Sequence, residues 1–531
     1  MAETMFSREL LSSSQKRIMQ RFYFRHLQQQ QQHCFLRGSK FSSSFHSSCI
    51  TKMSAHRISD YRPYLSTSSA LRKPSAIRKL IPLMSSRPDM VSLGGGLPNP
   101  NLFPFTSLHF TVKGLIDNSG KHSSSSSDRT TMKELELSSE ELGLALQYSP
   151  TPGVPQLVSF LNSLQQREHA KDLNANIANS NIKNAREENN YLPSQPSPEW
   201  NYDVSVTVGS QDGLCKAFEM LLDPFSQDDE LFVESPTYPG ALGFLRPYGC
   251  KLIPVPTDEH GIQPEQLSKL LQESSSSHSS SYPFGENDQQ KRKKRRVLYT
   301  IPTAQNPSGS TLSNDRRIAI YHLARKYDLI ILEDDPYYFL HPNRQCIPSF
   351  LSIDHNLGDG RVLRFDSFSK LLSSGMRLGF VTGPPTLVNQ LNLHTQTTNL
   401  HASGISQLLA YKLLDYWGLD GFDDHAASTA TFYNNRRNVL LSAAHQNLSP
   451  DLAEWNIPEA GMFLWIKILN GIHDTKTLVE EKAVDAGVLF VPGQSFCPLN
   501  EPSSYVRASY STASDEDMNV AMERLAALIR K

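Results

Sequence analysis

The chain has 531 residues, of which 38% are hydrophobic and 20% charged, and its formal net charge is -1. This length predicts about two or three domains of roughly 100–200 residues each. The balanced charge argues against a general nucleic-acid binder, and no run of about 18 apolar residues is present to span a membrane. The six cysteines form no CxxC pair and no metal-ligand spacing, so we expect no metal and reduced thiols in an intracellular protein.

Residues 1–52 differ from the rest of the chain. They contain eight Lys or Arg residues but only two acids, Glu3 and Glu9. A basic, Ser-rich and acid-poor start is typical of a mitochondrial transit peptide, and a disordered extension is the alternative. We therefore expect a mitochondrial matrix protein if this segment is used, and a cytoplasmic one if translation starts at Met53.

Three polar segments interrupt an otherwise globular pattern, at residues 118–128, 169–198 and 273–296. Such segments bury too little apolar surface to offset the ordering of their backbone, so we expect mobile surface loops. The last one ends in KRKKRR, which could be a nuclear signal or an RNA-binding patch. Its place between a helix-like and a strand-like segment favours a solvated loop.

Between these segments, strand patterns alternate with helix patterns. One helix begins after Gly209, and another, opened by Ser313, has apolar residues with helical spacing. The runs that predict buried strands are DVSVTV (203–208), ELFVES (230–235), KLIPVP (251–256), RVLYTI (296–301), LIILED (329–334), RVLRFD (361–366) and RLGFVT (377–382). This alternation predicts an α/β fold with a mostly parallel sheet that helices cover on both faces.

The C-terminal part has a different pattern. MFLWIKI (462–468), VLFVPG (488–493) and YVRASYS (505–511) predict strands, and a closing helix begins near Ser514. These elements predict a smaller α+β domain. We expect an N-terminal arm with part of the small domain at 53–100, a large domain at 101–395 and the rest of the small domain at 396–531.

Polar motifs follow several of the predicted strands, where ligands bind in open α/β sheets. Gly209-Ser210-Gln211 opens a helix, and helix N-terminal N–H groups favour a phosphate, although many strand-to-helix turns have this composition. Asn306 and Pro307 follow another strand, and ordinary turn residues are the alternative there.

Three adjacent acids, Glu333, Asp334 and Asp335, end an apolar strand. An unpaired charge buried there is costly or becomes protonated, so each acid that points inward needs a cation, a metal or a protonated heterocycle. The neighbouring motifs supply no further metal ligands. A protonated pyridine fits this position, and Tyr337 would reach the opposite side of its ring.

The segment FDSFSKLLSSGMRLGF (365–380) places Ser367, Ser369, Lys370 and Arg377 at the end of the next strand. The serines and the arginine could hold a phosphate, and the lysine could form a carbon–nitrogen double bond with an aldehyde. An aldehyde, a phosphate and a basic ring nitrogen in one molecule describe pyridoxal phosphate. An exposed lysine is the alternative for Lys370 alone, but motifs at successive strand ends favour the cofactor.

The chain resembles the class I, fold-type I pyridoxal-phosphate aminotransferases, and within them the kynurenine/α-aminoadipate and the fungal aromatic and aminoadipate enzymes. The likeness runs from about Ser66 to the C-terminus, outside the polar segments. It is carried by SLGGGLPNPNLFPF, LQYSP, GSQDGLCKAFEM, ILEDDPYYFL, DSFSK, SSGMRLGFVTGP, EWNIPEAGMFLWIK and YVRAS. The resemblance implies a large cofactor-binding domain and a smaller α+β domain.

The resemblance also implies roles for individual residues. Lys370 would bind the cofactor covalently and move a proton, Asp334 would pair with the ring nitrogen, and Tyr238 would stack on the ring. The other cofactor contacts would come from Ser210, Gln211, Asn306, Tyr337, Ser367, Ser369 and Arg377, and from Tyr148 of the other subunit of a homodimer. The substrate contacts would come from Arg507, Asn306, Gly96, Arg78 and Tyr148. An ordinary salt bridge is the alternative for Arg507.

The implied activity moves the amino group of an aromatic amino acid, kynurenine or 2-aminoadipate to 2-oxoglutarate with ping-pong kinetics. Two alternatives are another fold-type I enzyme, such as a C–S lyase or a synthase, and a non-catalytic regulator that binds pyridoxal phosphate. Such regulators carry a helix-turn-helix domain before the aminotransferase-like part. Residues 1–64 are too short and too low in complexity to supply one.

Overall fold

The computed structural model describes residues 57–75, 96–113, 132–171, 199–276 and 294–530. These residues all belong to one compact unit. The expected transit peptide, the polar segment at 118–128 and Arg78 lie outside the described residues. None of the described helices combines the length and the apolar character that crossing a membrane requires. The boundary between a large and a small domain stays a prediction.

The central element is an eight-stranded sheet. Its strands, in spatial order, are β3 (Asp203–Thr207), β10 (Gly379–Gly383), β9 (Val362–Ser367), β8 (Leu329–Asp334), β7 (Arg296–Thr300), β4 (Glu230–Ser235), β5 (Lys251–Asp258) and β6 (Gly261–Ile262). Neighbouring strands pair in parallel, except that β10 runs antiparallel to β3 and β9, and β6 runs antiparallel to β5. The predicted mostly parallel sheet is confirmed.

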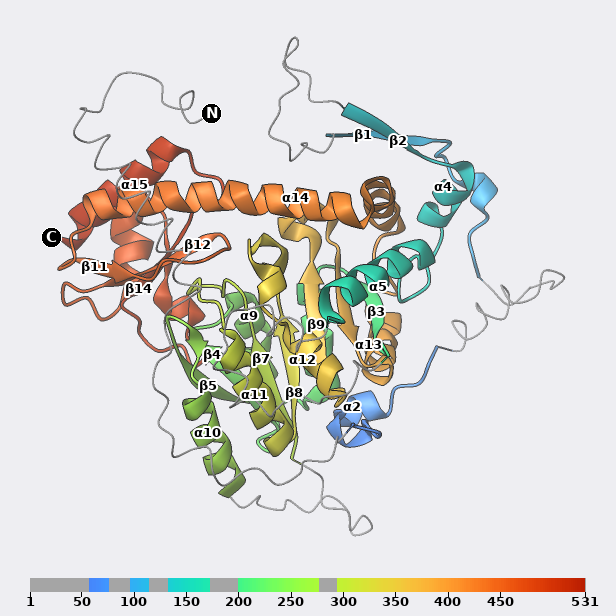
Figure 1. The fold of residues 1–531 in the computed structure, drawn as a ribbon, viewed down its shortest axis with the longest axis horizontal. Coiled ribbons are helices and arrows are strands. Elements are labelled where there is room, and N and C mark those ends of the chain that lie inside the picture. Colours follow the sequence, from blue (N-terminus) through green and yellow to red (C-terminus); the bar gives the residue numbers. More distant parts are fainter. Residues whose placement is uncertain (1–56, 76–95, 114–131, 172–198, 277–293, 531) are drawn as a thin grey trace. The chain divides into compact units, whose positions relative to one another are not determined.

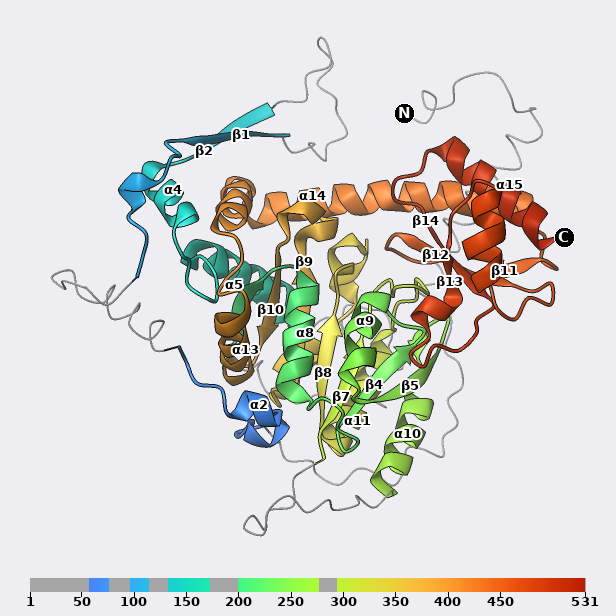
Figure 2. The same cartoon turned by 180° about the vertical axis from the view of Figure 1, so that it is seen from behind.

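Helices cover both faces of this sheet. On one face lie α5 (Pro155–His169), α10 (Pro264–Ser276), α11 (Asn314–Tyr327) and α12 (Phe350–Leu357), of which α5, α11 and α12 stand in front of the strands in Figure 1. On the other face lie α8 (Ser210–Leu221), α9 (Pro239–Tyr248) and α13 (Pro385–Thr398), which come forward in Figure 2. The strands between these two layers are therefore shielded on both sides.

Local sequence explains most of these elements. Helix α11 begins where the predicted cap Ser313 accepts a hydrogen bond from the backbone of Arg316. Strands β8 and β9 are buried at every position, as continuous apolar runs between two helical layers require. Strand β5 is only partly buried, because its outer neighbour β6 has two residues.

A second, four-stranded sheet lies in the C-terminal part, with β11 (Ala453–Trp455), β12 (Phe463–Ile468), β14 (Tyr505–Ser509) and β13 (Val491–Pro492) in that order. Its core is shared with α14 (Gly404–Asn447), which bends at Gly418, and with α15 (Asp515–Ile529). The predicted cap Ser514 forms a capping box with Asp517. The predicted strand at 488–493 is mostly wrong, because only Val491 and Pro492 pair with β14 and a short helix begins at Gly493.

Shorter elements complete the described chain. The strands β1 (Leu108–Lys113) and β2 (Met132–Leu137) pair with each other, and β2 leads into α4 (Ser139–Leu146). Short helices are η2 (Arg62–Tyr64), α2 (Thr67–Ala70), η3 (Pro100–Leu102), η4 (Tyr338–Leu340), η5 (Arg344–Cys346), η6 (Phe368–Lys370), η7 (Ser374–Met376), η8 (Leu478–Ala483) and η9 (Gly493–Phe496).

The expected loop at 169–198 begins too early. His169 is the last residue of α5 and is fully buried. Its Nδ1 atom lies 2.9 Å from the hydroxyl of Ser349. The polar composition that follows hid this buried position, since a histidine beside Asn-rich sequence does not look like a core residue.

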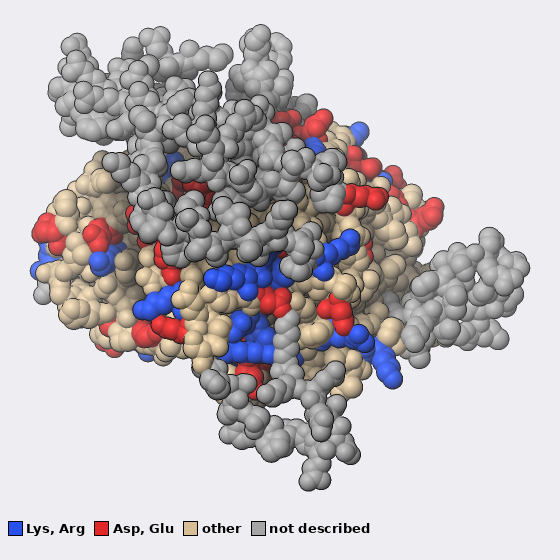
Figure 3. Space-filling model, turned by 60° about the horizontal axis from the view of Figure 1, so that its bottom comes forward, with Lys and Arg blue, Asp and Glu red and all other residues tan. Residues whose placement is uncertain are grey.

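The prediction of a solvated loop at residues 273–296 is wrong at both ends of this segment. Its first four residues, 273–276, belong to α10, and the last three residues of KRKKRR are paired with acids. Arg295 donates to Asp229 at 2.8 Å and lies 2.7 Å from a carboxylate oxygen of Asp223. Figure 3 shows Lys and Arg side chains beside Asp and Glu side chains on the face turned forward. The end of the basic run is therefore part of the folded protein.

Candidate active site

The fold brings most of the predicted site residues to one edge of the central sheet. Those that end or follow parallel strands are Ser210 and Gln211 (after β3), Tyr238 (β4), Asn306 (β7), Asp334 and Tyr337 (β8), and Ser367, Ser369 and Lys370 (β9). Arg377 instead precedes β10. Because β10 runs opposite to its neighbours, its amino end lies at the same edge as their carboxyl ends.

Asp334 is the last residue of β8, and its side chain is buried. Its Oδ2 atom accepts a hydrogen bond from the hydroxyl of Tyr299 at 2.9 Å, whereas Oδ1 has no hydrogen-bond partner among the described residues. Burial raises the pKa of Asp334 to about 7, and the bond from Tyr299 opposes this increase. A buried oxygen without a partner is costly, so Oδ1 fits a donor that does not belong to this chain.

The two acids beside Asp334 are neutralised inside the protein. Nη1 of the buried Arg364 lies 3.2 Å from Glu333 Oε1 and 3.2 Å from Asp335 Oδ2. Glu333 also accepts hydrogen bonds from two backbone N–H groups at the start of α12, at 2.8 and 3.1 Å. Asp335 Oδ1 is unpartnered as well, but its other oxygen has a cation. Glu333 and Asp335 thus have the cationic partner that an inward-facing acid was expected to need, whereas Asp334 has none among the described residues.

Lys370 ends η6, directly after β9, and is partly buried. Burial lowers the pKa of Lys370, and the positive charges of Arg507 and Arg377 lower it further. A lower pKa increases the fraction of neutral amine, which is the form that attacks a carbonyl carbon. This environment favours a nucleophilic lysine over an ordinary surface lysine.

Arg377 and the start of α8 form an anion-binding corner. The guanidinium Nη1 of Arg377 donates to the hydroxyl of Ser369 at 3.4 Å and to the backbone oxygen of Ser374 at 3.3 Å. A Cβ atom on Gly209 would lie 2.5 Å from Nη2 of Arg377, and Gly209 has a positive φ of 76°. Glycine therefore lets the guanidinium approach the first turn of α8, whose free N–H groups attract a phosphate.

Two tyrosines lie near Asp334. Burial raises the pKa of Tyr238 and of Tyr337, and the negative charge of Asp334 is the next cause for both, so both rings lie within its electrostatic range. A Cβ atom on Gly240 would overlap the ring of Tyr238. Gln211 donates to the backbone oxygen of Gly240 at 2.9 Å. Aromatic rings beside an unpaired buried acid suit a flat heterocycle with a basic nitrogen.

Arg507 reaches this edge from the second sheet, on β14. Its Nη1 atom donates to Asn306 Oδ1 at 2.8 Å, and its Nε atom is buried without a partner among the described residues. The guanidinium carbon lies 4.1 Å from the ring centroid of Phe463 and 5.0 Å from that of Phe496. No acid in the described ranges forms a salt bridge with Arg507. The planar guanidinium group can therefore bind the carboxylate of a substrate through two N–H groups.

Two residues that shape the site were missed by sequence reasoning. Tyr299 donates a hydrogen bond to Asp334, as described above. Glu234 is the next-to-last residue of β4 and supports the loop that carries Asn306. Glu234 Oε1 accepts from the hydroxyl of Thr300 at 2.7 Å, and Oε2 accepts from the amide of Gln305 at 3.1 Å. Burial raises the pKa of Glu234 to about 7. An acid at the end of the apolar run ELFVES was a signal of the same kind as Asp334.

Two predicted residues, Gly96 and Tyr148, are not brought to the cluster. Gly96 is exposed, and a Cβ atom there would meet nothing within 4 Å. Tyr148 is 50% exposed, with its ring edge-on to His401 at 6.0 Å. Arg78 lies outside the described residues. Tyr148 was expected to act in a partner subunit, so its role and those of Gly96 and Arg78 stay predictions.

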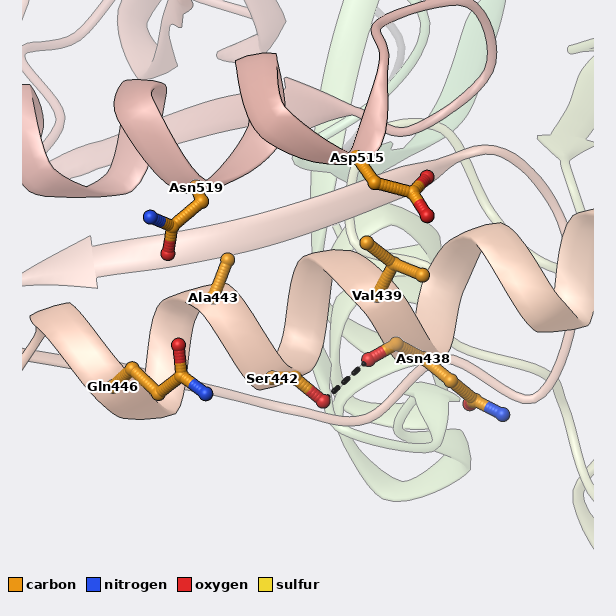
Figure 4. Close-up of a pocket in the computed structure, with 7 residues that line it drawn as sticks. All are labelled: Asn438, Val439, Ser442, Ala443, Gln446, Asp515 and Asn519. Carbon is orange, nitrogen blue, oxygen red and sulfur yellow. Dashed lines mark hydrogen bonds between the residues drawn. The ribbon is translucent and has the colours of Figure 1, made fainter. Parts of the chain in front are cut away.

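A hollow of about 370 Å³ lies elsewhere, between α14 and α15. Figure 4 shows its lining residues, which are Asn438, Val439, Ser442, Ala443, Gln446, Asp515 and Asn519. Neither a lysine nor an arginine faces it, and none of the predicted site residues lines it. Within the described ranges, no group of His, Cys, Asp or Glu side chains could hold a metal ion. This hollow therefore shares no lining residue with the predicted site at the edge of the sheet.

The residues at that edge fit a phosphorylated pyridine aldehyde. The unpartnered Asp334 Oδ1 suits a protonated ring nitrogen, the corner of Gly209 and Arg377 suits a phosphate, and Lys370 suits an aldehyde. The free side of Arg507 suits the carboxylate of an amino acid. A mostly parallel sheet with these groups at its carboxyl edge is the arrangement that the resemblance to fold-type I enzymes predicts.

The chain belongs to the family of class I and II aminotransferases, whose model matches residues 157–525. It is 42% identical over 474 residues to the mitochondrial kynurenine/alpha-aminoadipate aminotransferase of Mus musculus, which covers 89% of this chain and 99% of that protein. An aromatic amino acid aminotransferase of Schizosaccharomyces pombe is 32% identical over 509 residues, or 89% of this chain and 98% of that protein.

Solved structures agree with this family. The crystal structure of aminotransferase Aro8 from Candida albicans superposes with a TM-score of 0.71 at 27% identity, covering 90% of this chain and 99% of that one. A Pyrococcus horikoshii kynurenine aminotransferase, solved in complex with PMP, superposes with a TM-score of 0.60 at 26% identity, covering 89% and 98%. The protein is an aminotransferase, and the family, fold class and enzyme class predicted from sequence are confirmed.

Proposed function

We propose that this aminotransferase uses pyridoxal phosphate to move the amino group of kynurenine, 2-aminoadipate or an aromatic amino acid to 2-oxoglutarate. The observation that carries the proposal is the unpartnered buried oxygen of Asp334 at the same sheet edge as Lys370. The relatives from mouse and Schizosaccharomyces pombe are named for kynurenine and alpha-aminoadipate and for aromatic amino acids, respectively, which supports this class of amino donor.

Several residues would hold the cofactor. The phosphate would lie at the first turn of α8 with Arg377, Ser367 and Ser369, and the ring would lie beside Tyr238. Asp334 would keep the ring nitrogen protonated, because its buried carboxylate has no cationic partner among the described residues. When bound, pyridoxal phosphate supplies an aldehyde that takes up amines and a conjugated ring that accepts electrons.

Lys370 does the proton transfer in this proposal. Its lowered pKa increases the fraction of neutral amine, which is the form that would bond to the cofactor aldehyde and would be released when a substrate amine takes its place. The released amine of Lys370 would act as the base that takes the proton from the substrate Cα and delivers it to the cofactor. A second oxo acid reverses the sequence, which makes the kinetics ping-pong.

Arg507 orients the substrate. Two N–H groups of its planar fork suit the α-carboxylate, and the contact of Nη1 with Asn306 fixes the plane of the fork. The ring of Phe463 against the guanidinium restricts its movement. With the carboxylate held there, the Cα–H bond is presented to Lys370, and substrates without a carboxylate lose this orientation.

The identity of the amino donor is tested by assaying the chain that starts at Met53 with a panel of amino acids and oxo acids. The expected result is turnover with kynurenine, 2-aminoadipate or aromatic amino acids, together with release of glutamate from 2-oxoglutarate. No transfer with any of these donors would refute the proposal. Release of a sulfur fragment or a cyclised product without glutamate would instead indicate a C–S lyase or a synthase, and a shift of DNA mobility would indicate a regulator.

A homodimer is part of the proposal. Exposed apolar side chains occur in the N-terminal part of the described chain, at Leu102 (81%), Phe105 (64%) and Met132 (70%), near the half-exposed Tyr148 in sequence. A second copy of the chain would cover such side chains. Light scattering of the purified protein is expected to give twice the chain mass, and a concentration-independent monomer would contradict this.

Mitochondrial import is also proposed. The mouse relative is named as mitochondrial, and residues 1–52 have the composition of a transit peptide. A fusion of residues 1–52 to a fluorescent reporter is expected to enter mitochondria. The same reporter with the arginines of this segment changed to glutamine is the control, and cytosolic fluorescence of the first fusion would refute the address.

A further inference from the structure

Tyr299 lies on β7 with a side chain that is 0% exposed. In the parallel pairing of β7 with β8 it stands opposite Leu332, two residues before Asp334. Its hydroxyl donates to Asp334 Oδ2 at 2.9 Å. Its ring packs edge-on against Phe218, with the ring centroids 5.6 Å apart. The contact with the site acid is therefore made from within the core by a side chain that packing holds in place.

The electrostatic surroundings make this hydrogen bond important. After burial, the carboxylates of Asp335, Asp366 and Glu234 raise the pKa of Asp334, and the bond from Tyr299 lowers it. Asp335 directly follows β8, Asp366 lies on β9 and Glu234 lies on β4. The buried Arg364 pairs with Asp335 and Asp366, but these acids still act to raise the pKa of Asp334. Among the described residues, Tyr299 supplies the hydrogen bond that favours the ionised form.

Two further titratable groups of the described chain respond to the charge of Asp334. They are Tyr238, at the start of α9, and Tyr337, in the turn after β8, and the pKa of each is raised by burial and then by the Asp334 charge. Both stay neutral phenols near pH 7 because their pKa values are raised. Neither one adds positive charge to the environment of Asp334.

We propose that Tyr299 is a positioning residue that determines how Asp334 holds the bound cofactor. This inference rests on the proposed function and deepens it. The hydrogen bond to Oδ2 fixes the plane of the carboxylate and leaves Oδ1 for the ring nitrogen. Because the bond favours the ionised acid, it also keeps the shared proton on the ring nitrogen rather than on Asp334. Tyr299 itself touches neither cofactor nor substrate in this role.

A matched control exists in the same chain. Tyr321 on α11 is also 0% exposed, and its hydroxyl donates at 2.5 Å to a different buried acid, Asp354. It belongs to the core on the other face of the sheet. Tyr321→Phe therefore removes an equivalent phenol hydroxyl and deprives a buried carboxylate of one hydrogen bond, without affecting Asp334.

The first measurement is the affinity of the cofactor-free chain for pyridoxamine phosphate, which has no aldehyde and so forms no covalent bond with Lys370. Tyr299→Phe is expected to raise the Kd about tenfold, as loss of one hydrogen bond to a charged group does, whereas Tyr321→Phe leaves it unchanged. In an Asp334→Asn background, Tyr299→Phe is expected to add no further loss, since its effect passes through Asp334.

The second measurement is the visible absorption band of the protein loaded with pyridoxal phosphate, followed from pH 5 to 10. With less positive charge on the ring, the nitrogen of Lys370 becomes more basic, so the midpoint is expected to rise by roughly 0.5–1 pH unit in Tyr299→Phe. A 3-fluorotyrosine at position 299, which keeps the shape and donates more strongly, is expected to lower it. This second substitution also serves if the phenylalanine variant does not fold.

The outcomes separate the inference from the proposed function. If the unchanged protein takes up no yellow chromophore, the cofactor is wrong and the inference falls with it. If that protein binds the cofactor but Tyr299→Phe changes neither Kd nor midpoint, only the inference is overturned. A weaker affinity with an unchanged midpoint, or an undiminished effect in the Asp334→Asn background, shows a merely structural tyrosine and overturns it as well.

Discussion

The two edges of the central sheet carry similar buried charges but differ in how these charges are paired. At the edge where β4 and β7 begin, Glu230 contacts Lys251 at 3.0 Å and Lys294 at 2.7 Å, and Asp229 pairs with Arg295. At the opposite edge, Asp334 lacks a cation and Arg507 lacks an acid among the described residues. Charges that neutralise one another stabilise the fold, whereas charges left without protein partners mark the place where a ligand binds.

Lys370→Ala is expected to have the largest effect. Removing the amine deletes both the covalent attachment and the proton-transfer group, so kcat/KM for the best donor should fall by at least about a thousandfold. The measurement is a coupled glutamate assay, with borohydride trapping of the cofactor and mass spectrometry as a second readout. Wild-type rates, or an adduct trapped on another lysine, would contradict the assignment.

At the other edge, Arg295→Met is expected to lower the free energy of unfolding by about 3–5 kcal/mol, because it leaves the carboxylate of Asp229 buried without its arginine. Urea unfolding measures the loss, and turnover per folded molecule should not change. Arg296→Met is the control, because Glu230 keeps Lys251 and Lys294. Equal losses in both variants would show that pairing does not decide stability at this edge.

Arg507→Lys should weaken substrate binding without unfolding the protein. A lysine keeps the charge but loses the planar fork, so KM for donors and for 2-oxoglutarate is expected to rise about ten- to a hundredfold. Steady-state kinetics with both substrates tests this. Loss confined to one substrate would mean that the two carboxylates do not share Arg507.

A further expected effect is on the pH dependence of stability. The pKa of Asp334 rises from 3.8 to about 7 on folding, so the folded chain binds a proton more tightly than the unfolded chain between these values. The free energy of unfolding of the cofactor-free protein should therefore fall as pH rises from about 4 to about 7. Thermal unfolding of Asp334→Asn should show a shallower decrease, and an unchanged slope would contradict the raised pKa.

Much of the fold was predictable because its strands are buried between helices. Runs such as LIILED and RVLRFD became fully buried strands, and Ser313 and Ser514 proved to be caps. The antiparallel direction of β10 was not predictable, because RLGFVT has the same apolar composition as the parallel strands. The short β13 was also beyond prediction, since its pairing depends on a turn that begins at Gly493.

The site was predictable where a motif carries several polar residues at a strand end. Lys370, Asp334 and Arg377 stand in such motifs and meet at one edge. Tyr299 was missed because it lies within a strand, where an aromatic side chain is expected for packing alone. The paired end of KRKKRR was misjudged, since composition does not show that Asp229 and Glu230 lie across from it. Both errors concern contacts between segments far apart in the sequence.

The reversed direction of β10 has a consequence for protein engineering. The turn between β9 and β10 holds both Lys370 and Arg377, so one segment of sixteen residues would secure two ends of the same small molecule. Lengthening that turn by one residue would spare the hydrogen-bonded ladders of both strands yet change the spacing of the two anchors. Variants with a longer or shorter turn would therefore show how strictly the spacing of Lys370 and Arg377 determines which vitamin B6 analogue binds, when analogues of different length are compared.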